Sequence, residues 1–345
     1  MKVCSLINKP IKCGTNAIHQ ELSRLDNQWN LVCLRKAKKC FSTFRCHSCL
    51  CLSLERFLNM RFLRDVSSIL NEYDVVLVDG LVNFYLILLL QKLDMIRGET
   101  YFLVHNDYVA LNTRTNYKLV PNQVFTFLYD FALKRHRKNI CVSHNTKKFL
   151  DDRGVNSLVV PNGISMAQQV KKCTSSDLNI WYIGRLIRLK CIDILIESLA
   201  NVDEPYTLNV VGDGPELKYL KSLAIKKNVN VKFFGFLNSP FEYVKPADIF
   251  VLPSLVEGRS IALMEALAQK CFVIASDIDG NSQFSRFGVK MFKSGCPISL
   301  VSHLQEAIDM RVDGRSEYIE RYFDSVVNEL SSEAMLDSYK RIFYV

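Results

Sequence analysis

The chain has 345 residues, of which 49% are hydrophobic and 23% are charged, and its formal net charge at pH 7 is +9. This length suits two domains, and the composition is that of a globular protein, which excludes a disordered chain. No uninterrupted apolar run reaches the roughly 20 residues of a membrane-spanning helix, and the apolar start of the chain is too short for a signal peptide.

The positive charge is confined to the first half of the chain. Residues 1–170 contain 23 Lys and Arg against 13 Asp and Glu, whereas the remainder contains 21 against 22. Basic clusters at residues 35–39 and 134–138 have aromatic residues and leucines nearby. Such a surface can bind anionic lipid, an acidic glycan or nucleic acid, and it can equally be a solvated face without a partner.

The twelve cysteines, in a chain without a secretion signal, indicate reduced thiols in the cytoplasm. Cys46, Cys49 and Cys51, with His47 between them and Cys40 upstream, suggest a zinc site at first sight. A structural zinc site needs four ligands with paired spacing, and no second pair follows at a suitable distance. We therefore expect free thiols in this stretch.

Strands and helices alternate along the first half. Continuous apolar runs predict strands, and apolar residues at helical spacing predict the helices between them. The predicted strands are residues 2–7, 29–34, 74–79, 101–104, 140–143 and 158–160, and the predicted helices include residues 55–70 and 145–152. Gly14 and Thr15 lie at the first strand-to-helix turn, where a glycine lets the backbone approach a ligand. His105 follows the fourth strand, at the edge where parallel sheets bind ligands.

The second half repeats this alternation after a polar segment, residues 165–178, that we interpret as a linker. Its predicted strands are residues 179–183, 208–211, 231–234, 247–252 and 273–275. Arg185 and Lys190 follow the first of these strands, and a guanidinium with an ammonium group suits a diphosphate. Gly212-Asp213-Gly214 is only half of a dinucleotide fingerprint, so we do not predict an NAD site.

The most informative stretch is Leu252 to Ala268, in which a strand ends and a helix is predicted to begin at the N-cap residue Ser260. Glu257 lies just before this helix and Glu265 more than one turn inside it, so both can face one cleft. The backbone N–H groups of Gly258 to Ile261 lie between the two carboxylates and suit an anion. A ligand with hydroxyls at both ends and phosphates in the middle fits this arrangement, and nucleotide sugars have that shape.

The Glu257-x7-Glu265 spacing after a strand and a Pro-Ser turn resembles retaining glycosyltransferases of family four, which have the GT-B fold. Other landmarks agree in order and spacing along residues 180–280: Gly184-Arg185-Leu186 with Lys190, Gly212-Asp213-Gly214-Pro215-Glu216, and Gly235-Phe236. The resemblance implies an α/β protein with two Rossmann-like, doubly wound domains that face each other across a cleft. We expect an acceptor-side domain at 1–164, a nucleotide-sugar-binding domain at 179–325, and a C-terminal helix at 326–345 that crosses back to the first domain.

The resemblance also implies roles for individual residues. Arg185 and Lys190 would bind the donor pyrophosphate and stabilise the departing nucleoside diphosphate. Glu257 would hold the hydroxyls of the donor sugar and Glu265 those of the ribose, while His105 would lie near the reacting centre. Further donor contacts are expected at Gly14, Thr15, Gly235, Phe236, Leu237, Gly258, Arg259, Ser260 and Ile261.

No metal ion is expected, because a positively charged phosphate clamp makes a divalent cation unnecessary. Asp277 and Asp279 resemble the Asp-x-Asp metal motif of another glycosyltransferase fold. They lie, however, after the strand that follows the Glu-x7-Glu helix, where relatives have a glycine-rich turn. Arg259 is expected to add a charged contact to phosphate or to an acidic sugar.

The resemblance thus implies a retaining, metal-independent transferase that moves a hexose-type sugar from a UDP- or GDP-sugar to a glycan or lipid-linked glycan. It would act in cell-surface polysaccharide or glycoconjugate synthesis, in the cytoplasm, with its basic half at the inner face of a membrane and without nucleic acid. Two alternatives remain open: a GT-B sugar-nucleotide epimerase, and a non-catalytic protein that binds glycans or nucleic acid. Neither the sugar, the base nor the acceptor is specified.

Overall fold

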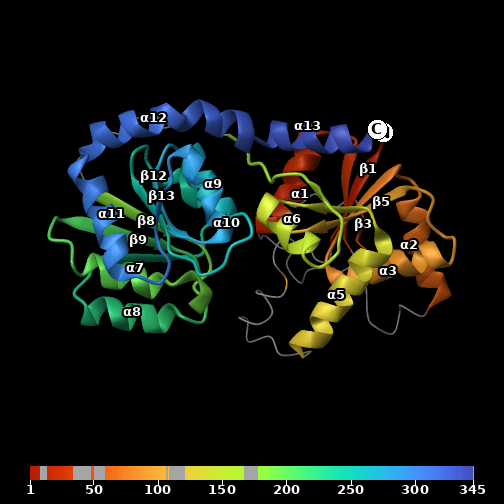
Figure 1. Cartoon of the computed structure of the whole chain (residues 1–345), viewed down its shortest axis with the longest axis horizontal. Helices are drawn as coiled ribbons and strands as arrows, with labels where there is room; N and C mark the ends of the chain where they lie inside the picture. Colours follow the sequence, from red (N-terminus) through yellow and green to blue (C-terminus); the bar gives the residue numbers. More distant parts are fainter. Residues whose placement is uncertain are drawn as a thin grey trace. The chain divides into compact units, whose positions relative to one another are not determined.

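The computed structural model describes residues 1–7, 14–33, 48–49, 59–105, 108, 121–166 and 178–344. The chain forms two compact units, one made of residues 1–163 with 332–345 and the other of residues 164–331. In each unit a parallel sheet carries helices on both of its faces (Figure 1). The basic cluster 35–39, most of the predicted linker and most of the cysteine-rich stretch lie outside the described residues.

The sheet of the first unit has seven parallel strands, among the described residues, in the order β3-β2-β1-β4-β5-β6-β7. Their bounds are Val3–Ile7 (β1), Trp29–Cys33 (β2), Ser48–Cys49 (β3), Val75–Asp79 (β4), Glu99–Val104 (β5), Asn139–Cys141 (β6) and Leu158–Val159 (β7). Runs such as Val-Val-Leu-Val in β4 suit strands that are covered on both faces. The strand order reverses between β1 and β4, and doubly wound sheets bind ligands at the carboxyl ends beside such a reversal.

Helices cover both faces of this first sheet. Their bounds are Gly14–Leu25 (α1), Met60–Leu70 (α2), Leu81–Lys92 (α3), Asn122–His136 (α5), His144–Asp151 (α6) and Ser332–Phe343 (α13). Alternate strand residues, such as Leu6, Val78 and Phe102, pack with α2, α3 and α5. On the opposite face α1 and α13 lie side by side, and Trp29 packs against Tyr339 of α13 with ring centroids 5.3 Å apart (Figure 1).

Within the described residues, the sheet of the second unit has six parallel strands in the order β10-β9-β8-β11-β12-β13. Their bounds are Leu178–Ile183 (β8), Tyr206–Val211 (β9), Val231–Gly235 (β10), Ile249–Leu252 (β11), Phe272–Asp277 (β12) and Lys290–Lys293 (β13). The order reverses between β8 and β11. This repeats the arrangement of the first sheet, so the ligand-binding edge is expected where β8 and β11 end.

The helices of the second unit are also divided between two faces. Their bounds are Ile192–Leu199 (α7), Leu217–Lys226 (α8), Ile261–Ala268 (α9), Asp279–Ser282 (α10), Pro297–Asp309 (α11) and Arg311–Leu330 (α12), with short 3-10 turns at Arg188–Lys190 (η2), Pro240–Glu242 (η3) and Ser285–Phe287 (η4). Residues of α7, α8 and α11 pack on one face, and those of α9 and α12 pack on the other (Figure 1).

Two long helices, α5 and α12, were not predicted, because neither has a single apolar stripe. In α5 the exposed Val124, Phe127 and Phe131 lie on the side away from the buried Ala132 and Leu133, so the apolar pattern covers both sides of the helix. The 20-residue α12 is largely polar, with scattered apolar residues rather than an even stripe.

The C-terminal boundary also differs from the prediction. A separate helix was expected from residue 326, but residues 326–330 complete α12 and the last helix begins at Ser332. Within α12 the buried Arg315 donates from Nε to the Ala247 carbonyl, at 2.7 Å, and from Nη1 to the Ala307 carbonyl, at 2.7 Å. These bonds fix α12 to the second unit, whereas α13 belongs to the first.

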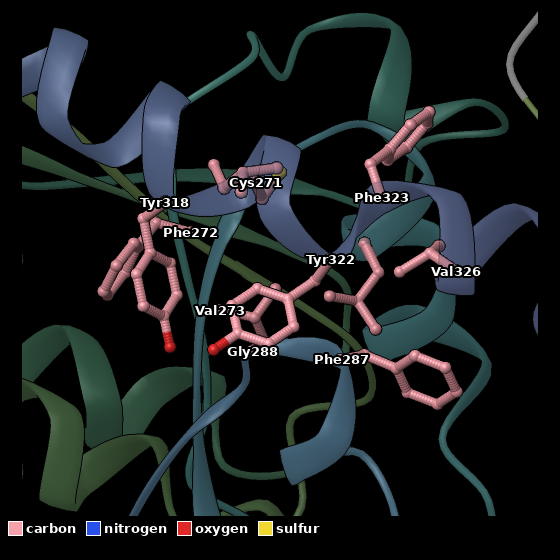
Figure 2. A pocket seen from close by; sticks show the side chains of 11 residues that line it. Cys271, Phe272, Val273, Phe287, Gly288, Tyr318, Tyr322, Phe323 and Val326 are labelled. Carbon is pink, nitrogen blue, oxygen red and sulfur yellow. The ribbon is translucent and has the colours of Figure 1, made fainter.

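An apolar pocket lies beneath α12, where Tyr322 and Val326 face η4 and the start of β12 (Figure 2). Its volume is about 10 Å³, which is at the lower limit for one water molecule. Gly288 adjoins it with a φ of +79°, and a Cβ atom there would lie 2.5 Å from Cδ2 of Tyr322. The pocket is therefore a gap in the packing of α12 and not a ligand site.

Candidate functional site

Two loops meet where the strand order of the second sheet reverses, one following β8 and the other following β11. Lys190 Nζ, from the first loop, donates a hydrogen bond to Oε1 of Glu257, from the second. Ser254 Oγ donates to the same oxygen at 2.7 Å. The side chains of Lys190 and Glu257 are only 17% and 11% exposed. The structure thus brings together two residues that the sequence analysis assigned to donor binding.

Hydrogen bonds to neighbouring segments hold the loop that carries Glu257 in place. The Leu255 amide donates to the Leu189 carbonyl at 2.8 Å, which joins the two loops directly. Ser276 Oγ donates to the Ser254 carbonyl at 2.5 Å, and Asn281 Nδ2 donates to the Ser276 carbonyl at 3.0 Å. The carboxylate is therefore positioned by neighbours on β12 and α10 as well as by its own turn.

Close backbone approach explains the Gly-x-Gly sequence without a dinucleotide. A Cβ atom on Gly212 would lie 1.9 Å from the Gly184 carbonyl oxygen, and one on Gly214 would lie 2.2 Å from that of Leu186. Any larger residue would push the loop after β9 away from the loop after β8. These glycines serve the packing of the loop that carries Arg185.

Helix α9 begins as predicted, with Ser260 as its N-cap. The Ser260 hydroxyl accepts a hydrogen bond from the Leu263 amide at 3.4 Å. Gly258 and Ile261 lie on either side of this cap, at the positively polarised end of the helix. Glu265 is partly exposed on the second turn of α9.

Arg259 has a different environment from the one expected for a phosphate ligand. Its side chain is 8% exposed, its Nη1 donates to Oε1 of Gln283 at 2.6 Å, and the guanidinium lies 5.2 Å from the ring centroid of Phe284. Burial lowers the pKa of Arg259 to about 10. In this structure the guanidinium therefore has Gln283 and the Phe284 ring as neighbours.

The loop after β8 presents Arg185 to solvent and ends in a left-handed turn. The hydroxyl of Tyr182 donates to the Arg185 carbonyl at 3.0 Å, while the Arg185 side chain is exposed. Cys191, directly after Lys190, has φ +47° and ψ 45°, a conformation that favours glycine. Its Sγ atom lies 3.3 Å from the Arg188 carbonyl oxygen. The turn thus adopts a left-handed geometry with a cysteine at this position.

The turn at Gly235, Phe236 and Leu237, where donor contacts are expected, has open space beside it. Gly235 has a φ of +69°, and no atom of the described residues lies within 4 Å of the position that its Cβ would take. Phe236 is 55% exposed and Leu237 is partly buried. The ring of Phe236 is therefore accessible at the carboxyl end of β10.

The remaining predicted site residues belong to the first unit. Gly14 is the first residue of α1, and the Thr15 side chain lies outside the described structure. His105 follows β5 and is 9% exposed. Burial lowers the pKa of His105 to about 4, so its ring is neutral at pH 7.

Two residues beside His105 were missed by the sequence analysis. His19 Nε2 and His105 Nε2 each lie 3.8 Å from Oδ2 of Asp79. Asp79 ends β4 just as His105 follows β5, so its place at the carboxyl edge was visible in the sequence. His19 reaches this edge from α1, and nothing in the sequence pattern indicated that.

The chain resembles known glycosyltransferases, most clearly in its second unit. Residues 168–322 match the family model described as glycosyl transferases group 1. The capsular polysaccharide biosynthesis glycosyltransferase CapH of Staphylococcus aureus is 29% identical over 134 residues, which are 36% of this chain and 38% of that protein. The O-antigen biosynthesis glycosyltransferase WclY of Escherichia coli is 24% identical over 294 residues, which are 81% of this chain and 80% of that protein.

Among solved structures, Anabaena HepE in complex with UDP aligns over 100% of both chains with a TM-score of 0.82 and 14% sequence identity. The fold is therefore the two-domain α/β GT-B fold, and the family match with the two relatives supports a transferase. In the described part of the chain, no helix has the length and apolar character needed to cross a membrane.

Proposed function

We propose that this protein is a retaining glycosyltransferase that moves a hexose from a nucleotide sugar to a glycan or lipid-linked glycan. The observation that carries the proposal is the contact between Lys190 and Glu257, at the sheet reversal of the segment that matches the family model. The relatives are named for capsular polysaccharide and O-antigen synthesis, and HepE was also solved with UDP-glucose. A UDP-sugar is therefore the first donor to test.

In this proposal the donor binds by replacing the ion pair between Lys190 and Glu257 with its own contacts to both side chains. Lys190 and Glu257 neutralise each other in a largely buried place, where an unpaired charge would be costly. An arriving diphosphate offers Lys190 stronger acceptors, and a sugar hydroxyl offers Glu257 a donor. The exchange leaves both side chains paired, so a ligand with both groups is favoured over free phosphate.

The chemical step would depend on stabilising the leaving diphosphate. Arg185, Lys190 and the backbone N–H groups at the start of α9 supply positive charge without a divalent ion at this place. The acceptor hydroxyl would attack the face from which the diphosphate departs, with retention of configuration. Glu265 would bind the ribose hydroxyls, and a role for His105 at the sugar remains a prediction.

The first unit offers a surface for a lipid-linked acceptor. On α5, Val124, Phe127 and Phe131 are 45%, 64% and 50% exposed, and their spacing places them on one face of the helix. Basic residues follow at the end of the helix: Lys134, Arg135, Arg137 and Lys138. Aromatic rings beside basic groups suit the headgroup region of an anionic membrane. We propose that this α5 surface binds the membrane that holds the acceptor.

A vesicle flotation assay tests the α5 surface. The protein should float with vesicles of anionic phospholipid and not with zwitterionic ones, and the double variant Phe127→Ser, Phe131→Ser should lose binding. The matched control is Tyr219→Ser, Ile225→Ser, which removes exposed apolar residues from α8 of the second unit. Equal binding by both double variants would reject the α5 surface while leaving the transferase proposal intact.

A donor panel tests the transferase proposal. Nucleotide sugars that bind should raise the melting temperature through ligand linkage, and the active donor should release its nucleoside diphosphate only when acceptor is present. Interconversion of the donor sugar without acceptor would instead identify an epimerase. A protein that neither binds nor turns over any nucleotide sugar would be a binding protein of another kind.

A further inference from the structure

The first unit contains a second group of chemistry-bearing side chains: His19, Asp79 and His105. Side chains alternate along a strand, and Ser5, Asp79 and His105 all point to the face that α1 and α13 cover. Asp79 is paired in register with Leu103 of β5, so His105 lies just beyond it along the sheet edge. His19 approaches from α1, above the same edge.

The distances within this group are too long for hydrogen bonds. Both Nε2 atoms lie 3.8 Å from Oδ2 of Asp79, and the three ligand atoms all lie within 4.8 Å of one another. Ligand atoms around a tetrahedral zinc ion are about 3.4 Å apart, given bonds of about 2.0–2.2 Å. The three side chains therefore surround a space of the size that a shared ion occupies.

Several polar atoms around this space have no partner among the described residues. His19 is 0% exposed and His105 is 9% exposed, yet in the part of the chain that the structure describes Nε2 of His19 and both ring nitrogens of His105 make no hydrogen bond. The hydroxyl of Tyr339, on the same face, is also buried without a hydrogen-bond partner among those residues. A buried polar atom left unpaired costs stability, so several in one place point to a bound group.

The neighbours of His19 are compatible with the tautomer that binds metal. Its Nδ1 lies 3.0 Å from Ser5 Oγ, and that oxygen also accepts a hydrogen bond from Trp29 Nε1 at 2.9 Å. A serine oxygen accepts two hydrogen bonds, so Nδ1 can carry the proton and donate it to Ser5. The lone pair of Nε2 then points toward Asp79, an arrangement common in metal-binding histidines.

We propose that His19, Asp79 and His105 bind a divalent transition metal ion, with zinc as the first candidate. Two imidazoles and one carboxylate suit zinc, whereas magnesium and calcium prefer oxygen ligands. Three protein ligands leave a fourth position for water or a hydroxyl-bearing molecule. The proposed diphosphate contacts, Arg185 and Lys190, belong to the second unit and are not ligands of this site.

Metal analysis of the purified chain tests the proposal. After zinc loading and removal of free ion, we expect about one bound equivalent, which Asp79→Asn and His19→Gln should each weaken at least about tenfold in affinity. His303→Gln, at a histidine paired with Glu306 in the second unit, should change nothing. Failure of the unmutated chain to retain zinc would overturn the proposal.

The cysteine-rich stretch requires its own control, because thiolates also bind zinc. A triple variant with serine at Cys46, Cys49 and Cys51 should keep its bound zinc. If this variant loses the metal while Asp79→Asn keeps it, the ion belongs to the cysteines and the proposal is wrong.

Cobalt substitution gives a readout that does not depend on the folding of a variant. Cobalt bound by nitrogen and oxygen in tetrahedral geometry should show visible absorption without the near-ultraviolet charge-transfer band of a thiolate. Zinc should also raise the melting temperature of the unmutated chain, and magnesium should not. A space filled by water would give neither signal, and that result would reject the site.

Discussion

Arg185 is the exposed cation of the candidate donor site, while Lys190 is already paired with Glu257. Charge on the leaving diphosphate grows in the transition state, so a cation beside it acts on kcat. Arg185→Ala should lower kcat about 10- to 100-fold, which corresponds to about 1.5–3 kcal/mol for a charged hydrogen bond. Steady-state release of nucleoside diphosphate measures this. Arg321→Ala, an exposed arginine paired with Glu317 on α12, is the control and should keep its kcat.

Glu265 lies on the second turn of α9 and is expected to bind hydroxyls that do not react. Removing such a contact weakens binding equally in the ground state and in the transition state, so KM rises and kcat does not change. Glu265→Gln should raise the donor KM about 10-fold or more, from the loss of about 1.5–3 kcal/mol. Donor titrations at saturating acceptor measure this, with Glu320→Gln on α12 as the control. An unchanged KM would contradict the ribose assignment.

His136 makes the first unit sensitive to acid. Its ring stacks on Phe102 with centroids 3.7 Å apart, and Nε2 lies 2.7 Å from Thr100 Oγ1. Burial lowers the pKa of His136 from its ordinary 6.5 to about 4, and a hydrogen bond to the Lys138 carbonyl only partly offsets this. Between these pH values the unfolded chain binds a proton that the folded chain does not. The contribution of the neutral His136 ring to the free energy of unfolding is therefore fully present above pH 6.5. It decreases toward pH 4, by at most about 1.4 kcal/mol per pH unit.

The measurement is the denaturant midpoint at several pH values, for the unmutated chain and for His136→Gln. The variant should show a shallower decline between pH 6.5 and 4. His105, whose pKa is lowered likewise, remains in both proteins and supplies the residual slope. Identical slopes would show that His136 takes up its proton without unfolding.

At the scale of elements, the packing of α12 depends on one glycine. Gly288 has a φ of +79°, and a Cβ atom there would lie 2.5 Å from the ring of Tyr322 (Figure 2). Gly288→Ala should therefore cost both backbone strain and displacement of α12, about 2–4 kcal/mol in all. Gly295→Ala is the matched control, because its φ is +73° and no atom of the residues that the structure describes lies within 4 Å of its Cβ position. That variant should lose only about 1–2 kcal/mol, and equal losses in denaturant unfolding would refute the clash with Tyr322.

The elements that could be predicted from the sequence are those with local signals. The strands consist of continuous apolar runs, and Ser260 caps α9 through its own hydroxyl. The strands and the start of α9 are therefore determined by residues close in the chain. Helix α5 could not be predicted in this way, because Phe127 and Phe131 are apolar and yet exposed. Helix α12 owes its position to distant bonds such as that from Arg315 to Ala247.

The candidate site shows the same limit. The sequence placed Lys190 and Glu257 at the ends of two strands, and the sheet order explains why those ends are neighbours. It did not indicate that the two side chains bind each other. Nor did it indicate that Arg259 turns inward to Gln283, because side-chain direction in a loop depends on the surrounding packing.

At the scale of the whole molecule, each unit contains one of the two tryptophans. Trp29 is buried beneath α13, and Trp181 donates from Nε1 to Oδ2 of Asp248 at 2.8 Å. Each unit has its own core, so we expect two unfolding transitions, each reported by its own tryptophan. Trp181→Phe and Trp29→Phe separate the two signals.

Tyr339→Ala tests this independence. Tyr339 is 0% exposed and packs on Trp29, so its loss should destabilise the first unit by about 3–5 kcal/mol. The transition reported by Trp181 should not move. Tyr344→Ala, next to the same helix and 64% exposed, is the control and should leave both transitions unchanged. A parallel shift of both transitions after Tyr339→Ala would mean that the units unfold together.

Because the chain returns to its first unit at its end, the two units are completed in a particular order during synthesis. The chain enters the second unit at Ile164, whose amide donates to the Leu330 carbonyl at 2.9 Å, and leaves it at Ser331. A ribosome therefore releases residues 164–331 as a complete folding unit while Trp29 still lacks the helix that covers it. The half that begins first is finished last, and a nascent chain stalled before Ser332 would expose an apolar face for chaperones to bind.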